Sequence, residues 1–107
     1  MSDLSDRKCE ACHPGTPSLE PEKAADFLSQ INPDWVMEDN RIERSFKFKN
    51  FRDAFGMATR VGLLAEQQGH HPDFELGWGF LKLTLTTHAA KGLTDNDFIL
   101  AAKIDEL

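Results

Sequence analysis

The sequence predicts an α+β fold: a four-stranded antiparallel sheet with its helices packed on one face, as a two-layer sandwich. Two kinds of pattern support this prediction. In some runs apolar residues alternate with polar ones, as in half-buried strands, and in others they recur at three- and four-residue steps, as in amphipathic helices. Along the 107 residues the order is helix, strand, strand, helix, strand, strand, helix, and a chain of this length is expected to form one domain.

The first elements are an irregular segment, a short helix and a hairpin. Residues 1–18 contain Pro, Gly, Ser and Asp without apolar periodicity, so we expect an irregular N-terminal segment ahead of a single domain over residues 19–107. A short helix is expected to begin at Pro21, whose missing N–H has no helical partner in a first turn. An extended run then begins at Trp35, and an Asp-Asn pair gives a turn signal before a second strand.

The second strand and the following helix differ in their period. Ile42 and Phe46 share one parity of the strand while charged residues take the other, which is typical of a strand with one buried face. Arg44 interrupts the apolar face. From Phe51 the apolar residues recur at three- and four-residue steps, which predicts an amphipathic helix that ends by Gly69.

Two more strands and a last helix complete the predicted fold. Alternating apolar residues mark the strands, and two glycines between them permit a bend. The alternating residues are Phe74, Leu76, Trp78, Leu81, Leu83 and Leu85. Thr94 and Asp97, three residues apart, resemble a capping box that opens the final helix.

Charge and composition argue against several classes of protein. With 12 Lys+Arg against 18 Asp+Glu the net charge is −6, which argues against general nucleic-acid binding, because that depends on a basic surface. No apolar stretch approaches the roughly 20 residues that a membrane helix needs, and the N-terminus lacks the apolar core of a secretory signal. The two cysteines are therefore expected to be reduced, and the protein to be cytoplasmic.

Cys9, Cys12 and His13 form a short motif with competing interpretations. Its spacing matches the pattern for covalent c-type haem attachment, but that chemistry takes place outside the cytoplasm. A structural zinc site has four protein ligands as a rule, and no second cysteine pair is present, so a distant histidine or a second subunit would have to complete it. The simplest interpretation is two exposed thiols on a loose segment.

The other three histidines lie where a site could form. His70 and His71 follow the expected helix end, and Pro72 pushes His71 toward an extended conformation, in which neighbouring side chains point to opposite sides. One imidazole could thus face a cleft while the other contacts a neighbouring element. His88 follows the last strand, at the rim of the sheet. Taken singly, each histidine fits a structural role as well as a catalytic one.

Together, the histidines and two acids resemble a known signature. The order Glu66, His70-His71-Pro72, Trp78, His88 and Asp97 is similar to that of the pterin-4a-carbinolamine dehydratases, and the similarity runs from Leu19 to Ile104. Further stretches that agree are Phe46-Lys47-Phe48-Lys49-Asn50-Phe51, Thr87-His88, Gly92-Leu93-Thr94 and Trp35 after Pro33-Asp34. Gly69 departs from the pattern, since animal members have an acidic residue at that position.

This resemblance implies a lyase that dehydrates 4a-hydroxytetrahydropterin to quinonoid dihydropterin, and so recycles the cofactor of aromatic amino-acid hydroxylases. It implies a homodimer or homotetramer, with the pterin as small-molecule substrate and a hydroxylase as a further partner. It assigns His70, His71 and His88 to the pterin site. The supporting residues that it implies are Glu66, Pro72, Trp35 and Asp97.

The chemistry fits these residue types independently. Loss of the 4a hydroxyl needs an acid to protonate the leaving group, and a base then removes a ring N–H proton. Histidine, with a reference pKa of about 6.5, can do either at neutral pH, so no metal or redox cofactor is required. We assign His70 and His88 to proton transfer and His71 to pterin binding, with Glu66 orienting an imidazole. Asp97 also fits a plain helix cap.

Two other functions stay open. The chain could be a non-catalytic module that binds a dimeric transcription factor or a hydroxylase, in which case His70 would be dispensable for partner binding. It could instead be a metalloprotein that uses the histidines or the cysteines. The spacing from Glu66 to His70 does not match the helical zinc motif, which has two histidines four residues apart.

Overall fold

The computed structural model describes residues 3–107, and its elements follow the predicted order. These residues form three α-helices, four strands and two short 3-10 helices. In chain order the elements are η1 (Asp3–Asp6), α1 (Pro21–Leu28), β1 (Val36–Glu38), β2 (Arg41–Lys47), α2 (Phe51–Gln68), β3 (Asp73–Gly77), β4 (Phe80–Leu85), η2 (His88–Ala90) and α3 (Asp95–Ile104).

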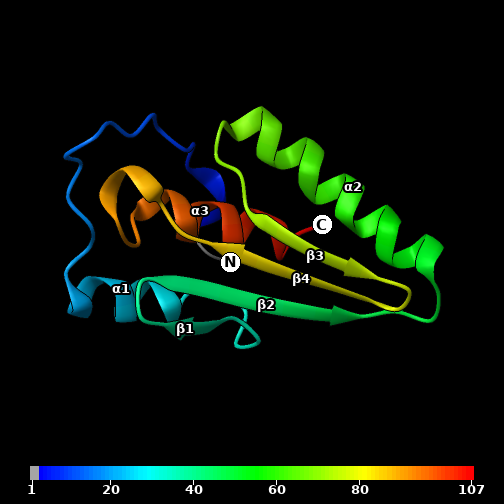
Figure 1. Ribbon diagram of the computed structural model, residues 1–107. Helices are drawn as coiled ribbons and strands as arrows, with labels where there is room; N and C mark the ends of the chain where they lie inside the picture. The colour runs from blue at the N-terminus through cyan, green and yellow to red at the C-terminus, as the bar shows by residue number, and fades with distance from the viewer. Residues whose placement is uncertain (1–2) are drawn as a thin grey trace.

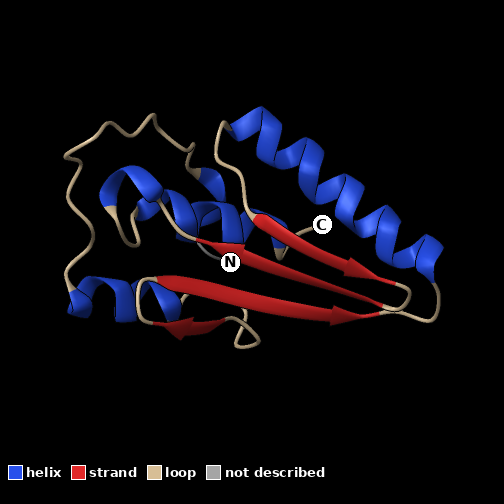
Figure 2. Ribbon diagram, in the orientation of Figure 1, coloured by secondary structure: helices blue, strands red, loops and turns tan. Residues whose placement is uncertain are grey.

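The strands form one antiparallel sheet in the order β1-β2-β4-β3, so β2 and β4 are central and β1 and β3 are the edges. The long helix α2 runs beside the β3–β4 hairpin and also contacts α3 (Figure 1). Colouring by secondary structure separates the sheet from the helical layer (Figure 2). The predicted α+β class with a four-stranded antiparallel sheet is confirmed.

The register of the central strands explains the alternating pattern. Ile42 pairs with Leu85, and Phe46 pairs with Leu81, which puts the apolar side chains of β2 and β4 on one face. Ile42 and the β4 leucines are fully buried under the helices in a single core. The opposite face carries polar groups such as Glu43 and Lys82, whose charged atoms lie 3.6 Å apart.

The last helix is the centre of the core. Nearly all of α3 is buried, and the Phe98 ring lies 5.6 Å from the Phe27 ring of α1. Helix α2 turns a narrower stripe inward, where Ala54, Val61 and Ala65 are buried. With this narrow stripe the helix contacts both the hairpin and α3.

Both ends of α2 are set by local chemistry. The Asn50 side chain accepts a hydrogen bond from the Asp53 N–H at 2.8 Å, which satisfies one of the unpaired donors of the first turn. Gly69 follows the last turn at φ 70°, in the left-handed region that glycine adopts without steric cost. The helix therefore stops where predicted, and the chain leaves it directly into His70.

The β3–β4 hairpin turns earlier in the chain than the alternation of apolar residues predicts. Gly77 ends β3 opposite Phe80, and an added Cβ at Gly77 would lie 2.1 Å from the Phe80 ring, so a larger residue there would displace that ring. Trp78 and Gly79 form the two-residue turn. Trp78, predicted to continue the strand, therefore sits exposed at the tip, because the alternation of apolar residues does not reveal where a strand turns.

The N-terminal segment is packed against the domain. The 3-10 helix η1 contacts α3, and Leu4 is only 1% exposed within the core. The Lys103 ammonium donates to the Ser5 carbonyl at 2.8 Å. Within residues 3–107, no helix combines the length and the apolar content needed to cross a bilayer.

Arg44 and Asp105 explain the charge on the apolar face of β2. Asp105, at the end of α3, forms an ion pair with Arg44 and accepts hydrogen bonds from the Trp35 indole N–H at 2.8 Å and the Asn32 N–H at 2.9 Å. The Arg44 guanidinium also lies 4.4 Å from the centre of the Phe46 ring. This cluster fastens the end of α3 to β2 and to the segment before β1.

Asp105→Ala is expected to lower the free energy of unfolding by about 3 kcal/mol, because it leaves the half-buried Arg44 guanidinium and two N–H groups without their acceptor. Urea denaturation followed by circular dichroism measures the change. Glu106→Ala, at the neighbouring exposed position, is the control and is expected to cost less than about 0.5 kcal/mol. Equal stability of the two variants would contradict this account of the cluster.

Candidate active site

Three of the four histidines lie at one pocket. His70 and His71 follow the end of α2, and His88 begins η2 just after β4. Gly69, Thr86, Thr87, Ala89, Asn96, Glu10 and Cys12 complete the lining. The pocket is thus built from the end of a helix, the end of a central strand, the start of α3 and a piece of the N-terminal segment.

His70 is held by a buried carboxylate. Its Nε2 lies 2.6 Å from Oδ1 of Asp97, and the two side chains are 11% and 0% exposed. The other carboxylate oxygen accepts the Thr87 hydroxyl at 2.8 Å and the Thr94 N–H at 3.0 Å. Asp97 is therefore both the predicted capping residue of α3 and the partner of a site histidine.

His71 is oriented on the surface. Its Nε2 lies 2.9 Å from Oε1 of Glu66, and the His71 side chain is 61% exposed. Glu66 was expected to orient an imidazole one turn further along, and the imidazole that it contacts is that of His71. The two neighbouring histidines thus pair with different acids, one buried and one exposed, as their extended backbone allows.

His88 is the least constrained of the three. Its side chain is exposed, and it has no hydrogen-bond partner among residues 3–107. The preceding residue, Thr87, is buried and bonds to both Asp97 and Thr94. The rigid support for His88 is therefore its backbone, while the ring itself is free to turn.

Of the two remaining expected residues, Pro72 follows His71 directly and Trp35 lies in the core. Pro72 is buried between His71 and β3, where it keeps the chain extended. Trp35 does not line the pocket. It is buried in the core and donates to Asp105, at the opposite end of α3 from Asp97 and about 12 Å away along the helix. Within this chain the structure therefore does not bring Trp35 to the histidine pocket.

Seven further residues line the pocket without having been predicted as site residues, among them Thr87, Asn96, Glu10 and Cys12. Thr87 belongs to the matching Thr87-His88 stretch, which was a usable signal. Asn96 neighbours Asp97 but shows no pattern of its own. Glu10 and Cys12 belong to the cysteine motif, and nothing in the sequence connects that motif to the histidines.

The cysteines of the motif are free thiols. Burial raises the pKa of Cys9 to about 11, against the weaker opposing effect of Lys103. Among residues 3–107, no three His, Cys, Asp or Glu side chains gather closely enough to hold a metal ion.

Comparison with known proteins identifies relatives of the whole domain. A model of the family described as pterin 4 alpha carbinolamine dehydratase matches residues 17–107. A protein of Alkaliphilus metalliredigens that carries this family's name is 45% identical over 99% of this chain and 96% of its own length. One of Rubrobacter xylanophilus, with the same name, is 44% identical over the full length of both chains.

Solved structures agree with this result. A crystal structure from Brucella melitensis, titled transcriptional coactivator/pterin dehydratase, has a TM-score of 0.76 and 33% identity over 83% of this chain and 96% of its own. A pterin dehydratase-like RuBisCO assembly factor of the alpha-carboxysome, at 18% identity and a TM-score of 0.55 over 67% of this chain and 83% of its own, shares the fold. The chain therefore belongs to the pterin-4-alpha-carbinolamine dehydratase family of hydro-lyases.

Proposed function

We propose that this protein removes water from 4a-hydroxytetrahydropterin to form quinonoid dihydropterin, with histidines as general acid and base. The observation that carries the proposal is the convergence of His70, His71 and His88 on one pocket, with His70 bound to buried Asp97. Membership of the family supports the reaction class. The roles of His70 and His71 are inferred from their hydrogen-bond partners, and that of His88 from its exposure at the pocket.

His70 is the base in this proposal. One oxygen of Asp97 already accepts two hydrogen bonds, and the other faces Nε2 of His70, so the imidazole carries its proton on Nε2 and leaves Nδ1 unprotonated. The carboxylate also stabilises the imidazolium that forms when Nδ1 accepts a proton. Nδ1 would take the ring N–H proton of the pterin.

His88 is the acid. It stands exposed at the pocket, where its unpaired ring can turn toward the 4a hydroxyl of a bound pterin. Protonation lets that hydroxyl leave as water while the electron pair of the adjacent ring nitrogen forms the new double bond. The proton that His88 gives equals the one that His70 takes, so the reaction uses no oxidant, metal or redox cofactor.

His71 binds the pterin and does not transfer protons. Its contact with Glu66 fixes the orientation of its ring at the mouth of the pocket. Because both side chains are exposed, the pair itself adds at most about 1 kcal/mol to stability, and its value lies in the direction it gives to the imidazole.

The product suggests where the reaction belongs. Quinonoid dihydropterin is the form that reduction returns to an aromatic amino-acid hydroxylase, so we place the activity after hydroxylation, in recycling that cofactor. The two free cysteines fit a reducing compartment such as the cytoplasm.

We also propose that the protein forms a homodimer or homotetramer. Large apolar side chains stay exposed on α2, at Phe51, Phe55 and Leu63, and on the β3–β4 hairpin, at Trp78 and Phe80. The rings of Phe51 and Phe55 stack with their centres 5.7 Å apart. Next to them β3 is an edge strand of the sheet. Exposed apolar surface and an open edge of this kind are typical of protein–protein contacts, and a second copy offers both.

His88→Ala and His70→Ala are each expected to lower kcat by about 100-fold or more, because each removes a proton-transfer group. The measurement is the absorbance change on dehydration of freshly prepared carbinolamine. His13→Ala, exposed and outside the pocket, is the control. If the wild type does not accelerate dehydration, or if His88→Ala retains the full rate, the enzyme proposal is wrong and a binding module is favoured.

Asp97→Asn is expected to lower kcat at least tenfold and to cost about 1–3 kcal/mol of stability, because the amide cannot accept all the hydrogen bonds of the carboxylate. Thr94→Ala is the matched control, since it weakens the same helix cap by about 1 kcal/mol and leaves the His70–Asp97 contact in place. Comparable kcat losses in both variants would mean that Asp97 acts only through the fold.

Phe55→Asp is expected to reduce the mass of the assembly measured by light scattering, because it places a charge in the apolar patch on α2. Phe55→Leu keeps the position apolar and is expected to retain the larger mass. A wild type that is already monomeric at micromolar concentration would refute the proposal.

A further inference from the structure

The N-terminal segment Cys9–Cys12 reaches the histidine pocket. Glu10 and Cys12 line that pocket together with His70, His71 and His88. The family model begins at residue 17, so this segment lies outside the residues that it matches. The cysteine motif therefore has a place in the structure that neither its metal interpretations nor the loose-tail interpretation explains.

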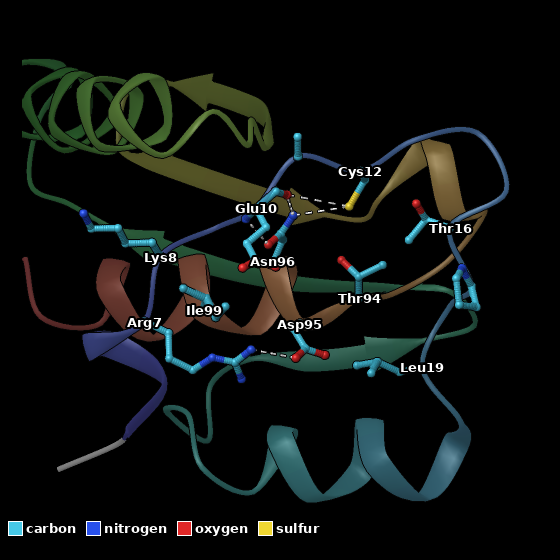
Figure 3. A pocket seen from close by; sticks show the side chains of 12 residues that line it. Arg7, Lys8, Glu10, Cys12, Thr16, Leu19, Thr94, Asp95, Asn96 and Ile99 are labelled. Carbon is cyan, nitrogen blue, oxygen red and sulfur yellow. Dashed lines mark hydrogen bonds and ion pairs between the residues drawn. The ribbon is translucent and has the colours of Figure 1, made fainter.

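Asn96 holds the segment in place. It is 6% exposed, and its side-chain amide pairs with both backbone groups of Glu10: Oδ1 accepts the N–H at 2.9 Å and Nδ2 donates to the carbonyl at 2.6 Å. Nδ2 also lies 3.4 Å from Sγ of Cys12. In Figure 3 the Asn96 amide points from the start of α3 toward Glu10 and Cys12. A side chain that satisfies both backbone groups of one residue fixes its position as a neighbouring strand would.

A second anchor holds the other end of the segment. The Cys9 N–H donates to Oε1 of Gln68 at 3.1 Å, and the Cys9 thiol lies 3.6 Å from the Asn96 carbonyl. Both anchors are next to the site, since Gln68 is two residues before His70 and Asn96 directly precedes Asp97. The segment is therefore attached to the same two helix ends that position the His70–Asp97 pair.

We propose that residues 9–12 form a fixed wall of the pterin site, and that Asn96 is a positioning residue which sets pterin affinity by holding this wall. The inference rests on the proposed function, because it takes the ligand of the pocket to be a pterin. Asn96 bonds to no histidine, so its loss is expected to weaken binding without slowing proton transfer. Cys12 lines the pocket, and added bulk on its sulfur would occupy part of the pterin site.

The first experiment compares Asn96→Ala with Asp95→Ala. Asp95 is the preceding residue of the same helix and also contacts the N-terminal segment, through an exposed ion pair with Arg7 at 2.8 Å, but it does not line the histidine pocket. Asn96→Ala is expected to raise KM for the carbinolamine, and Kd for 7,8-dihydrobiopterin, about tenfold with kcat within about twofold, a change of about 1.4 kcal/mol in binding. Asp95→Ala is expected to change none of the three.

The second experiment does not depend on the Asn96 variant folding. Cys9→Ser and Cys12→Ser proteins each keep one of the two cysteines, and each is treated with iodoacetamide at about pH 8, where an accessible thiol reacts through its thiolate. Alkylation of Cys12 in the Cys9→Ser protein is expected to weaken 7,8-dihydrobiopterin binding at least tenfold. Bound 7,8-dihydrobiopterin is in turn expected to slow the alkylation of Cys12. The treated Cys12→Ser protein is expected to bind as it did before treatment.

The outcomes separate the two proposals. The wall proposal is wrong if the wild type turns over the carbinolamine and Asn96→Ala leaves KM and Kd unchanged. It is also wrong if complete alkylation of Cys12 leaves pterin binding unchanged. Both results leave the dehydratase proposal intact. A wild type that neither turns over the carbinolamine nor binds 7,8-dihydrobiopterin overturns both. A wild type that binds the pterin without turnover, with binding weakened in Asn96→Ala, supports the wall and rejects catalysis.

Discussion

One buried carboxylate connects the parts of the chain that make the site. Asp97 accepts hydrogen bonds from Thr87 after β4 and from Thr94 at the start of α3, and it meets His70 after α2. Burying the Asp97 carboxylate would be costly if its oxygens lacked hydrogen bonds. The positive end of the α3 dipole also stabilises the negative charge. Because one group performs all these tasks, the start of α3 and the histidine site form together.

Much of the fold could be predicted from the sequence because it depends on local patterns. The alternation in β2 and β4 determines which face is buried, and Gly69 determines where α2 ends. The hairpin shows the limit of such patterns. Trp78 continues the parity of Leu76, yet only the pairing of Gly77 with the next strand shows that the chain has already turned there.

For the site, the sequence predicted the main residues but not most of their partners. The order of the histidines and acids, with its resemblance to a family, pointed to three histidines that line one pocket and to the two acids that contact His70 and His71. The partners were not predictable, because they depend on tertiary contacts. Asp105 binds the Trp35 indole and keeps it in the core, and Asn96 bonds to a segment 86 residues away in the chain. No periodicity or local propensity records such contacts.

The burial of Leu4 shows that the N-terminal segment belongs to the hydrophobic core. The family-matched region begins at residue 17, whereas the core already includes a side chain from η1, and Lys103 of α3 donates to the Ser5 carbonyl. The region that the family model matches and the packed unit of the structure therefore have different boundaries. A fragment cut at the family boundary would expose the apolar surface of α3 that Leu4 covers. The core of this protein thus extends to residues before the region that the family model matches.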